Sequence, residues 1–109
     1  GVLALQQVAH ALAADLHPPF HIAARLGGEE FCVLLYGATP EVAQVRFDNL
    51  LDRTRRLAIP HAASPDGFLT LSIGAATLAR GERFNTLVTR ADAALYRAKH
   101  EGRDRICWA

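Results

Sequence analysis

Two glycines followed by two glutamates, Gly27-Gly28-Glu29-Glu30, are the residues of this sequence best suited to chemistry. Glycine adopts positive φ at little cost and lets other groups approach the backbone closely. Carboxylate oxygens suit Mg²⁺, which proteins hold through one or two carboxylates together with the phosphates of a substrate. The segment therefore indicates a phosphoryl-transfer site. A solvated turn whose acids only keep the protein soluble would show the same pattern.

Two cations, Lys99 and Arg103, lie on either side of Gly102 near the end of the sequence. The five donors of a guanidinium group match the oxygens of a phosphate. Cations near the C-terminal end of a helix also interact favourably with the helix dipole and often do nothing else. The residues alone leave both interpretations open.

A β-hairpin is expected to position the glutamates. Residues 20–26 and 31–36 are typical of strands, and the two glycines between them are a tight-turn signal. A helix is expected before the hairpin, because His17-Pro18-Pro19 ends an apolar stripe of helical period. The stripe consists of Leu5, Val8, Ala9, Leu12 and Leu16.

Four further elements are expected after the hairpin. Thr39-Pro40-Glu41 begins a helix that continues to about residue 58, with a hydroxyl cap and proline at the first helical position. Residues 68–78 read as a long strand in which Gly74 marks a bulge or a close approach. A helix over 84–98, which Gly102 can terminate, precedes a short strand at 105–108. This alternation predicts an α+β sandwich with helices packed on a sheet, without fixing the strand order.

The bulk composition indicates one globular domain. The chain has 109 residues, of which 50% are apolar, and a formal net charge of +1. This charge provides no strong field for nucleic acid, and the strands lack the aromatic motif of an RNA-recognition fold. The apolar runs are far shorter than a membrane span. Cys32 and Cys107 are interpreted as reduced, buried thiols, while a disulfide or a metal role stays open.

Three blocks of the sequence resemble, in the same order, the GGDEF family of diguanylate cyclases. The first holds the Gly-Gly-acid signature in its Glu variant, the second the Ser-Ile-Gly strand, and the third the Ala-Asp-x-Ala-Leu-Tyr-x-Ala-Lys pattern with Gly-Arg after it. The first two blocks span residues 25–31 and 71–76, and the third spans residues 90–99 together with 102–105. The resemblance implies that residues 1–109 are a partial GGDEF domain, a nucleotide-cyclase-like sandwich. Its sheet would be mostly antiparallel and flanked by helices, with the family's first strand and helix missing.

The resemblance also implies an activity and residue roles. Two GTP molecules, one on each of two paired GGDEF domains, would be condensed into cyclic di-GMP and two pyrophosphates with the help of Mg²⁺ or Mn²⁺. Glu29 matches a metal ligand that is also the proposed base for the attacking hydroxyl, and Glu30 matches the second acid near metal and substrate. Gly27 and Gly28 match positions close to the nucleotide. The family's phosphate-contacting pair matches Lys99 and Arg103.

Other residues in the matching blocks are expected to serve the fold. Arg25 is interpreted as structural, and Asp92, Leu95 and Tyr96 as packing or helix-surface residues. The five histidines show no metal-ligand spacing.

The sequence departs from the family pattern near its start. The family's upstream strand and helix carry a second metal-binding Asp and an Asn that reads guanine, and Val2 takes the place of a further Asp. The product-inhibition motif Arg-x-x-Asp is replaced by Pro18 and His21 at its charged positions. The polypeptide is therefore expected to be inactive alone. The alternative is a degenerate GGDEF module that binds GTP or regulates a partner domain, such as a phosphodiesterase.

The surroundings of the domain are expected from the family as well. A sensor or receiver domain would lie upstream and control pairing, and no nucleic-acid partner is expected. The domain would be cytoplasmic, with any membrane anchor in upstream segments.

Overall fold

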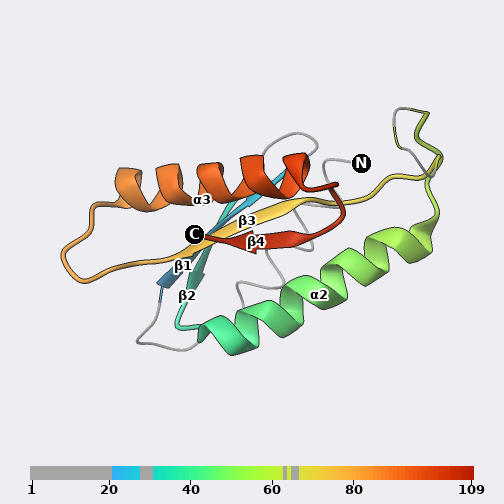
Figure 1. Ribbon diagram of the computed structural model, residues 1–109. Coiled ribbons are helices and arrows are strands. Elements are labelled where there is room, and N and C mark those ends of the chain that lie inside the picture. Colours follow the sequence, from blue (N-terminus) through green and yellow to red (C-terminus); the bar gives the residue numbers. More distant parts are fainter. Residues whose placement is uncertain (1–20, 28–30, 63, 65–66) are drawn as a thin grey trace.

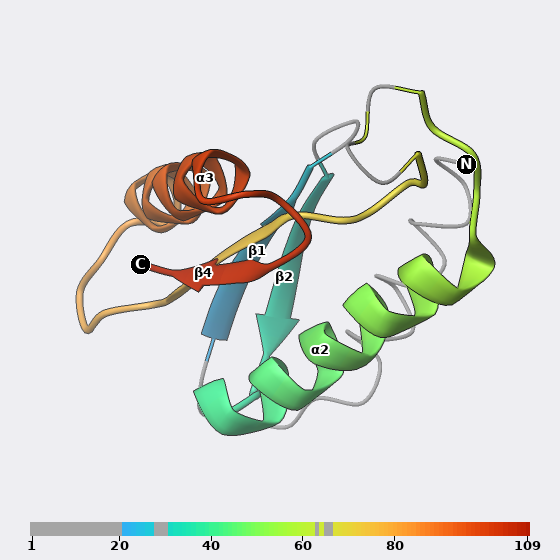
Figure 2. The same ribbon diagram turned by 45° about the vertical axis from the view of Figure 1, so that its right-hand side comes forward.

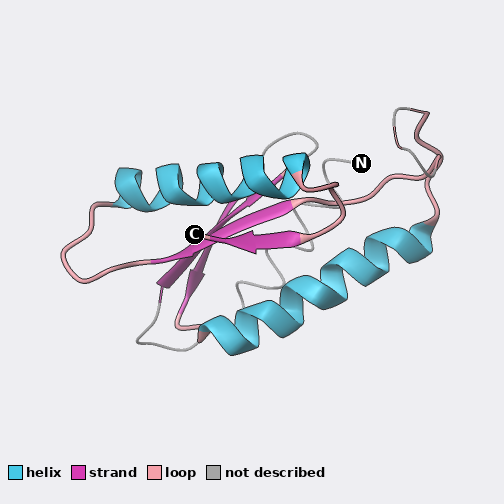
Figure 3. Cartoon of the chain, in the orientation of Figure 1, coloured by secondary structure: helices cyan, strands magenta, loops and turns pink. Residues whose placement is uncertain are grey.

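The structure is a computed structural model that describes residues 21–27, 31–62, 64 and 67–109 (Figure 1). The expected helix over residues 5–16 lies outside the described residues. Within them, no helix is both long and apolar enough to cross a membrane. Two strands come first, and helices and strands then alternate (Figure 3). The elements are β1 (His21–Leu26), β2 (Phe31–Tyr36), α2 (Pro40–Leu57), β3 (Ile73–Thr77), α3 (Phe84–His100) and β4 (Ile106–Trp108).

The described strands form one sheet in the order β2-β1-β3-β4. Strand β1 pairs antiparallel with both β2 and β3, and Leu26 at its end lies opposite Phe31 and Ile73. Strands β3 and β4 run parallel. The sheet is thus mostly antiparallel, as expected, and α2 and α3 cover its opposite faces (Figures 1 and 2).

The alternation of side chains along the strands divides the core between the two faces. On the α2 side, Ile22 and Leu26 of β1 belong to the same buried cluster as Phe47 of α2. On the α3 side, Ala23 of β1 packs in a cluster with Leu87 and Ala91 of α3. Strand β1 is therefore covered on both sides, which is why its four apolar residues are all buried.

Helix α2 begins and ends as its sequence predicts. The Thr39 side chain accepts a hydrogen bond from the Val42 N–H at 3.2 Å, and Pro40 occupies the first turn. The helix ends at Ala58, whose φ of 48° is left-handed and whose N–H bonds the Arg55 carbonyl. Both ends of α2 are thereby capped.

Helix α3 lies directly on strand β3 at Gly74. A Cβ at Gly74 would lie 2.0 Å from the Leu95 backbone N and 2.3 Å from the Ala91 carbonyl oxygen. The prediction of a close approach at Gly74 is therefore confirmed.

The predicted strand over residues 68–78 was too long. Strand β1 ends opposite Ile73, so residues before Ile73 have no β1 residue to pair with. Phe68 instead forms an isolated bridge with Pro60, and the Leu69 N–H bonds the Ile59 carbonyl at 2.7 Å. The start of this segment is a loop held by the residues that follow α2.

The cysteines are free thiols, but Cys32 is exposed rather than buried. It lies on the sheet face opposite the α2 core, and it belongs to the outer strand β2, beyond β1. Cys107 is half-buried and donates to Glu101 Oε2 at 3.0 Å. Burial raises the pKa of the Cys107 thiol, and the hydrogen bond to the Glu101 carboxylate raises it further. This thiol therefore stays protonated at neutral pH.

An ion pair fixes the connection between β3 and α3. Arg90 donates to the two carboxylate oxygens of Glu82 at 2.7 and 2.8 Å and to the Thr77 carbonyl at 2.6 Å. Glu82 also accepts from the Ala79 N–H at 3.0 Å. The bonds from Arg90, followed by the bond from Ala79, lower the pKa of Glu82 from 4.5 to about 2.

Replacing Gly74 with alanine is expected to destabilise the domain by more than about 3 kcal/mol, because the new methyl group would displace the helix backbone. Chemical denaturation monitored by circular dichroism measures this loss. Gly81→Ala is the control, since a Cβ at Gly81 would meet nothing within 4 Å and only the φ of 77° would be strained. That variant should lose about 1–2 kcal/mol. Equal losses in the two variants would contradict the close packing of α3 on β3.

The stabilising effect of Glu82 is expected to depend on pH. Because its pKa is lowered to about 2 in the folded state from 4.5, its contribution is complete above about pH 4.5 and is lost as the pH falls towards 2. The free energy of unfolding of wild type minus that of Glu82→Gln should be positive and constant above pH 5, and should shrink below it. A difference that stays constant from pH 5 to pH 2 would refute the ion-pair explanation.

Candidate active site

The first glycine of the predicted turn is held firmly by the sheet. Gly27 is buried at the end of β1, and its N–H donates to the Ser72 carbonyl at 2.8 Å. This bond continues the pairing of β1 with β3 into the turn. The bend therefore starts from a fixed point beside the second family block.

Gly27 lies against Lys99 of α3. A Cβ at Gly27 would lie 2.8 Å from Lys99 Cε, 3.4 Å from Leu95 Cδ1 and 3.5 Å from Lys99 Nζ. Only a residue without a side chain leaves the lysine stem in this position. The structure thus brings together two of the predicted substrate-binding residues, one from the hairpin and one from the last helix.

The remaining residues of the turn, Gly28, Glu29 and Glu30, lie outside the described residues. Among the described residues, no group of three or more His, Cys, Asp and Glu could hold a metal ion. Glu29 and Glu30 carry hard oxygen donors of the kind that fit Mg²⁺ or Mn²⁺. Their roles as metal ligands stay a prediction.

Arg25 ties the hairpin to α3 beside Lys99. Its Nε lies 2.6 Å from Asp92 Oδ1, and the Arg25 side chain is 20% exposed. The pair lies at a pocket of about 200 Å³, lined by Arg25, Asp92, Leu95, Tyr96 and Lys99. This contact agrees with the interpretation of Arg25 as structural. The partnership with Asp92 was not predicted, although Asp92, Tyr96 and Lys99 share one face of the helix by their spacing.

The end of α3 presents Arg103. The Arg103 N–H bonds the Ala98 carbonyl at 2.9 Å, and Gly102 before it has a φ of 125°. This is the Schellman arrangement that closes a helix at a left-handed glycine, so the predicted role of Gly102 is confirmed. Arg103 is exposed on the loop that follows, four residues after Lys99.

Comparisons with known proteins identify the family. Residues 1–105 match the family described as "Diguanylate cyclase, GGDEF domain". The chain therefore belongs to the GGDEF diguanylate cyclase family. The chain is 37% identical to diguanylate cyclase DgcP of Pseudomonas aeruginosa over 115 aligned residues. The match covers 97% of this chain but only 16% of DgcP.

Two solved structures share the fold. The coiled coil and GGDEF domain of DgcB from Caulobacter crescentus, solved in complex with c-di-GMP, matches 94% of this chain and 53% of its own chain. That match has a TM-score of 0.70 and 28% identity. The active GGEEF domain of a diguanylate cyclase from Vibrio cholerae matches with a TM-score of 0.66 and 29% identity, covering 97% of this chain and 64% of that one.

Gly27→Ala is expected to disturb the candidate site without unfolding the protein. The added methyl group meets the flexible end of Lys99, so the free energy of unfolding should change by less than about 1 kcal/mol. If this site binds GTP as the family resemblance implies, the affinity measured by calorimetric titration should fall at least about fivefold because the ammonium group must move. Gly81→Ala, just before the opposite end of α3, should lose stability and keep its affinity for GTP. Unchanged affinity in Gly27→Ala would argue against a role of this contact in binding.

Proposed function

We propose that the intact protein is a diguanylate cyclase that condenses two GTP into cyclic di-GMP and two pyrophosphates. The observation that carries the proposal is the contact of Gly27 with Lys99, which joins the acidic turn to the last helix. The sequence Gly-Gly-Glu-Glu-Phe of this turn also matches the motif in the name of the active GGEEF domain from Vibrio cholerae. A glutamate at the third position is therefore compatible with turnover.

The proposed roles follow from the chemistry of the side chains. Glu29 and Glu30 hold Mg²⁺ or Mn²⁺, and Glu29 accepts the proton of the attacking 3′-hydroxyl. Lys99 and Arg103 bind the phosphates of GTP and keep the α-phosphate oriented for in-line attack. A divalent cation bound at these carboxylates would neutralise phosphate charge and lower the pKa of the hydroxyl.

The proposal includes a second domain of the same kind. Each domain binds one GTP, and the 3′-hydroxyl of one nucleotide attacks the α-phosphate of the other, so two domains must face each other. Control of this pairing by an upstream sensor or receiver domain is part of the proposal, as is a cytoplasmic location with any anchor upstream. The 109-residue polypeptide alone is expected to be inactive.

A non-catalytic GGDEF module is the second candidate. Val2 takes a position where the family usually has an Asp, which favours this reading. Such a module would bind GTP, or regulate a partner domain such as a phosphodiesterase, without producing cyclic di-GMP. The two candidates differ in turnover and agree in the residues that contact the phosphates.

Turnover of the intact protein distinguishes them. Incubation with GTP and Mg²⁺ followed by chromatography should yield cyclic di-GMP, and Glu29→Gln should reduce the rate at least about 100-fold. Glu41→Gln is the matched control, because Glu41 is an exposed acid in the first turn of α2. An inactive wild type that still binds GTP would favour the non-catalytic module. Full activity of Glu29→Gln would exclude the proposed role of Glu29.

A further inference from the structure

The loop after α3 contains backbone strain beyond what its glycine explains. Gly102, Arg103 and Asp104 follow one another with positive φ values of 125°, 62° and 51°. Glycine adopts such values freely, but an arginine with a Cβ does so at a cost. A strained conformation of this kind persists only where the surroundings hold it in place.

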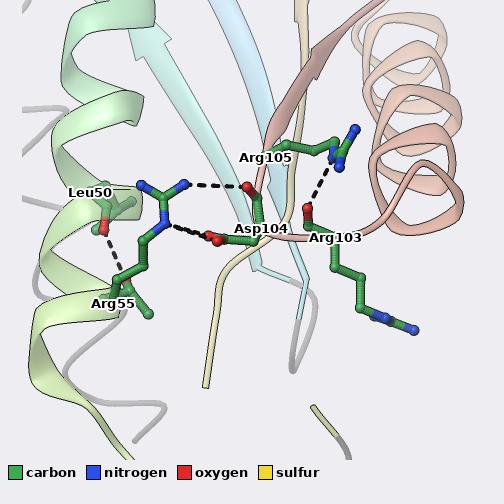
Figure 4. A network of polar contacts seen from close by, with 6 residues as sticks. Leu50, Arg55, Arg103, Asp104 and Arg105 are labelled. Carbon is green, nitrogen blue, oxygen red and sulfur yellow. Dashed lines mark hydrogen bonds and ion pairs between the residues drawn. The ribbon is translucent and has the colours of Figure 1, made fainter. Parts of the chain in front are cut away.

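An arginine from the other side of the sheet holds this loop. Arg55, in the last turn of α2, donates through Nε to Asp104 Oδ1 and Oδ2 at 2.8 and 2.9 Å (Figure 4). Its Nη2 also reaches the Asp104 backbone carbonyl at 3.3 Å. We refer to these three contacts between Arg55 and Asp104 as the clasp. They restrain both the side chain and the backbone of Asp104.

The backbone of Arg103 is fixed as well, whereas its side chain takes no part in the clasp. Its N–H bonds the Ala98 carbonyl at 2.9 Å, and its carbonyl accepts from Arg105 Nε at 3.0 Å. In Figure 4 the Arg103 side chain extends from the loop away from Arg55 and Asp104. The two bonds that Arg103 itself makes here thus involve its backbone, and its guanidinium group lies outside the clasp.

We propose that Arg55 and Asp104 are positioning residues, which hold the strained loop so that Arg103 is presented to the phosphates of GTP. This inference rests on the proposed function and extends it to helix α2. The planar guanidinium group of Arg55 fixes the orientation of the Asp104 carboxylate, which a single point charge would not do. A pre-ordered arginine binds an anion more tightly than one that must be ordered on binding.

The experiment measures the affinity of the intact protein for GTP with Mg²⁺ by calorimetry, and KM and kcat where there is turnover. Arg55→Ala and Asp104→Ala should each weaken GTP binding about fivefold, because Arg103 is no longer pre-ordered. Asp104→Gly, which accepts the left-handed φ without strain, should fold stably and still bind GTP weakly. The matched control is Arg56→Ala. Arg56 is the next residue on α2 and pairs with Asp52 at 2.8 Å instead, so its loss should leave affinity unchanged.

Measuring the effect of Arg55→Ala without Arg103 distinguishes a positioning role of the clasp from a general loss of stability. In an Arg103→Ala background, Arg55→Ala should cause no further loss of affinity or rise in KM. A further loss of the same size, or full affinity in Arg55→Ala and Asp104→Gly, would overturn the inference while leaving the proposed function intact. A wild type that neither turns over nor binds GTP would overturn the proposed function and the clasp's role with it.

Discussion

At Gly74 the backbone of α3 rests on strand β3 with no side chain between them, and the position of the candidate site depends on this contact. The helix runs along β3, so its last turn comes to the end of the sheet where β1 also ends. There the N–H of Gly27 bonds the carbonyl of Ser72, and the stem of Lys99 covers Gly27. A side chain at Gly74 would push α3 away from β3, and one at Gly27 would displace the end of the Lys99 side chain.

The C-terminal block has a second task besides supplying cations. It must end α3 and return the chain to the sheet as β4. The bond from Arg103 to Ala98 closes the helix, and Asp104 anchors the loop on Arg55 of α2. The two helices lie on opposite faces of the sheet (Figure 2). The clasp links Arg55 in the last turn of α2 to Asp104 in the loop after α3. In this arrangement, the loop that carries Arg103 is restrained from both layers.

Local signals account for the parts of the fold that the sequence predicted well. The limits of β2 and the capped start of α2 follow from a glycine turn, a hydroxyl cap and a proline. The three family blocks identified the family over nearly the whole chain. Contacts between distant segments carried no such signal. Four features depend on which elements meet in space. They are the ion pairs Arg25–Asp92 and Arg55–Asp104, the exposure of Cys32, and the end of the β1–β3 pairing at Ile73. The roles of Glu29, Glu30, Lys99 and Arg103 remain predictions.

The central claim is that the acidic turn and the end of α3 form one site for metal-bound nucleotide. Paramagnetic broadening by Mn²⁺ tests it most directly. With GTP present, substoichiometric Mn²⁺ should broaden the amide resonances of Gly27, Lys99 and Arg103, while those of Gly81 and Thr89 at the other end of α3 stay sharp. Broadening confined to residues elsewhere, with Gly27 and Lys99 unaffected, would contradict the account.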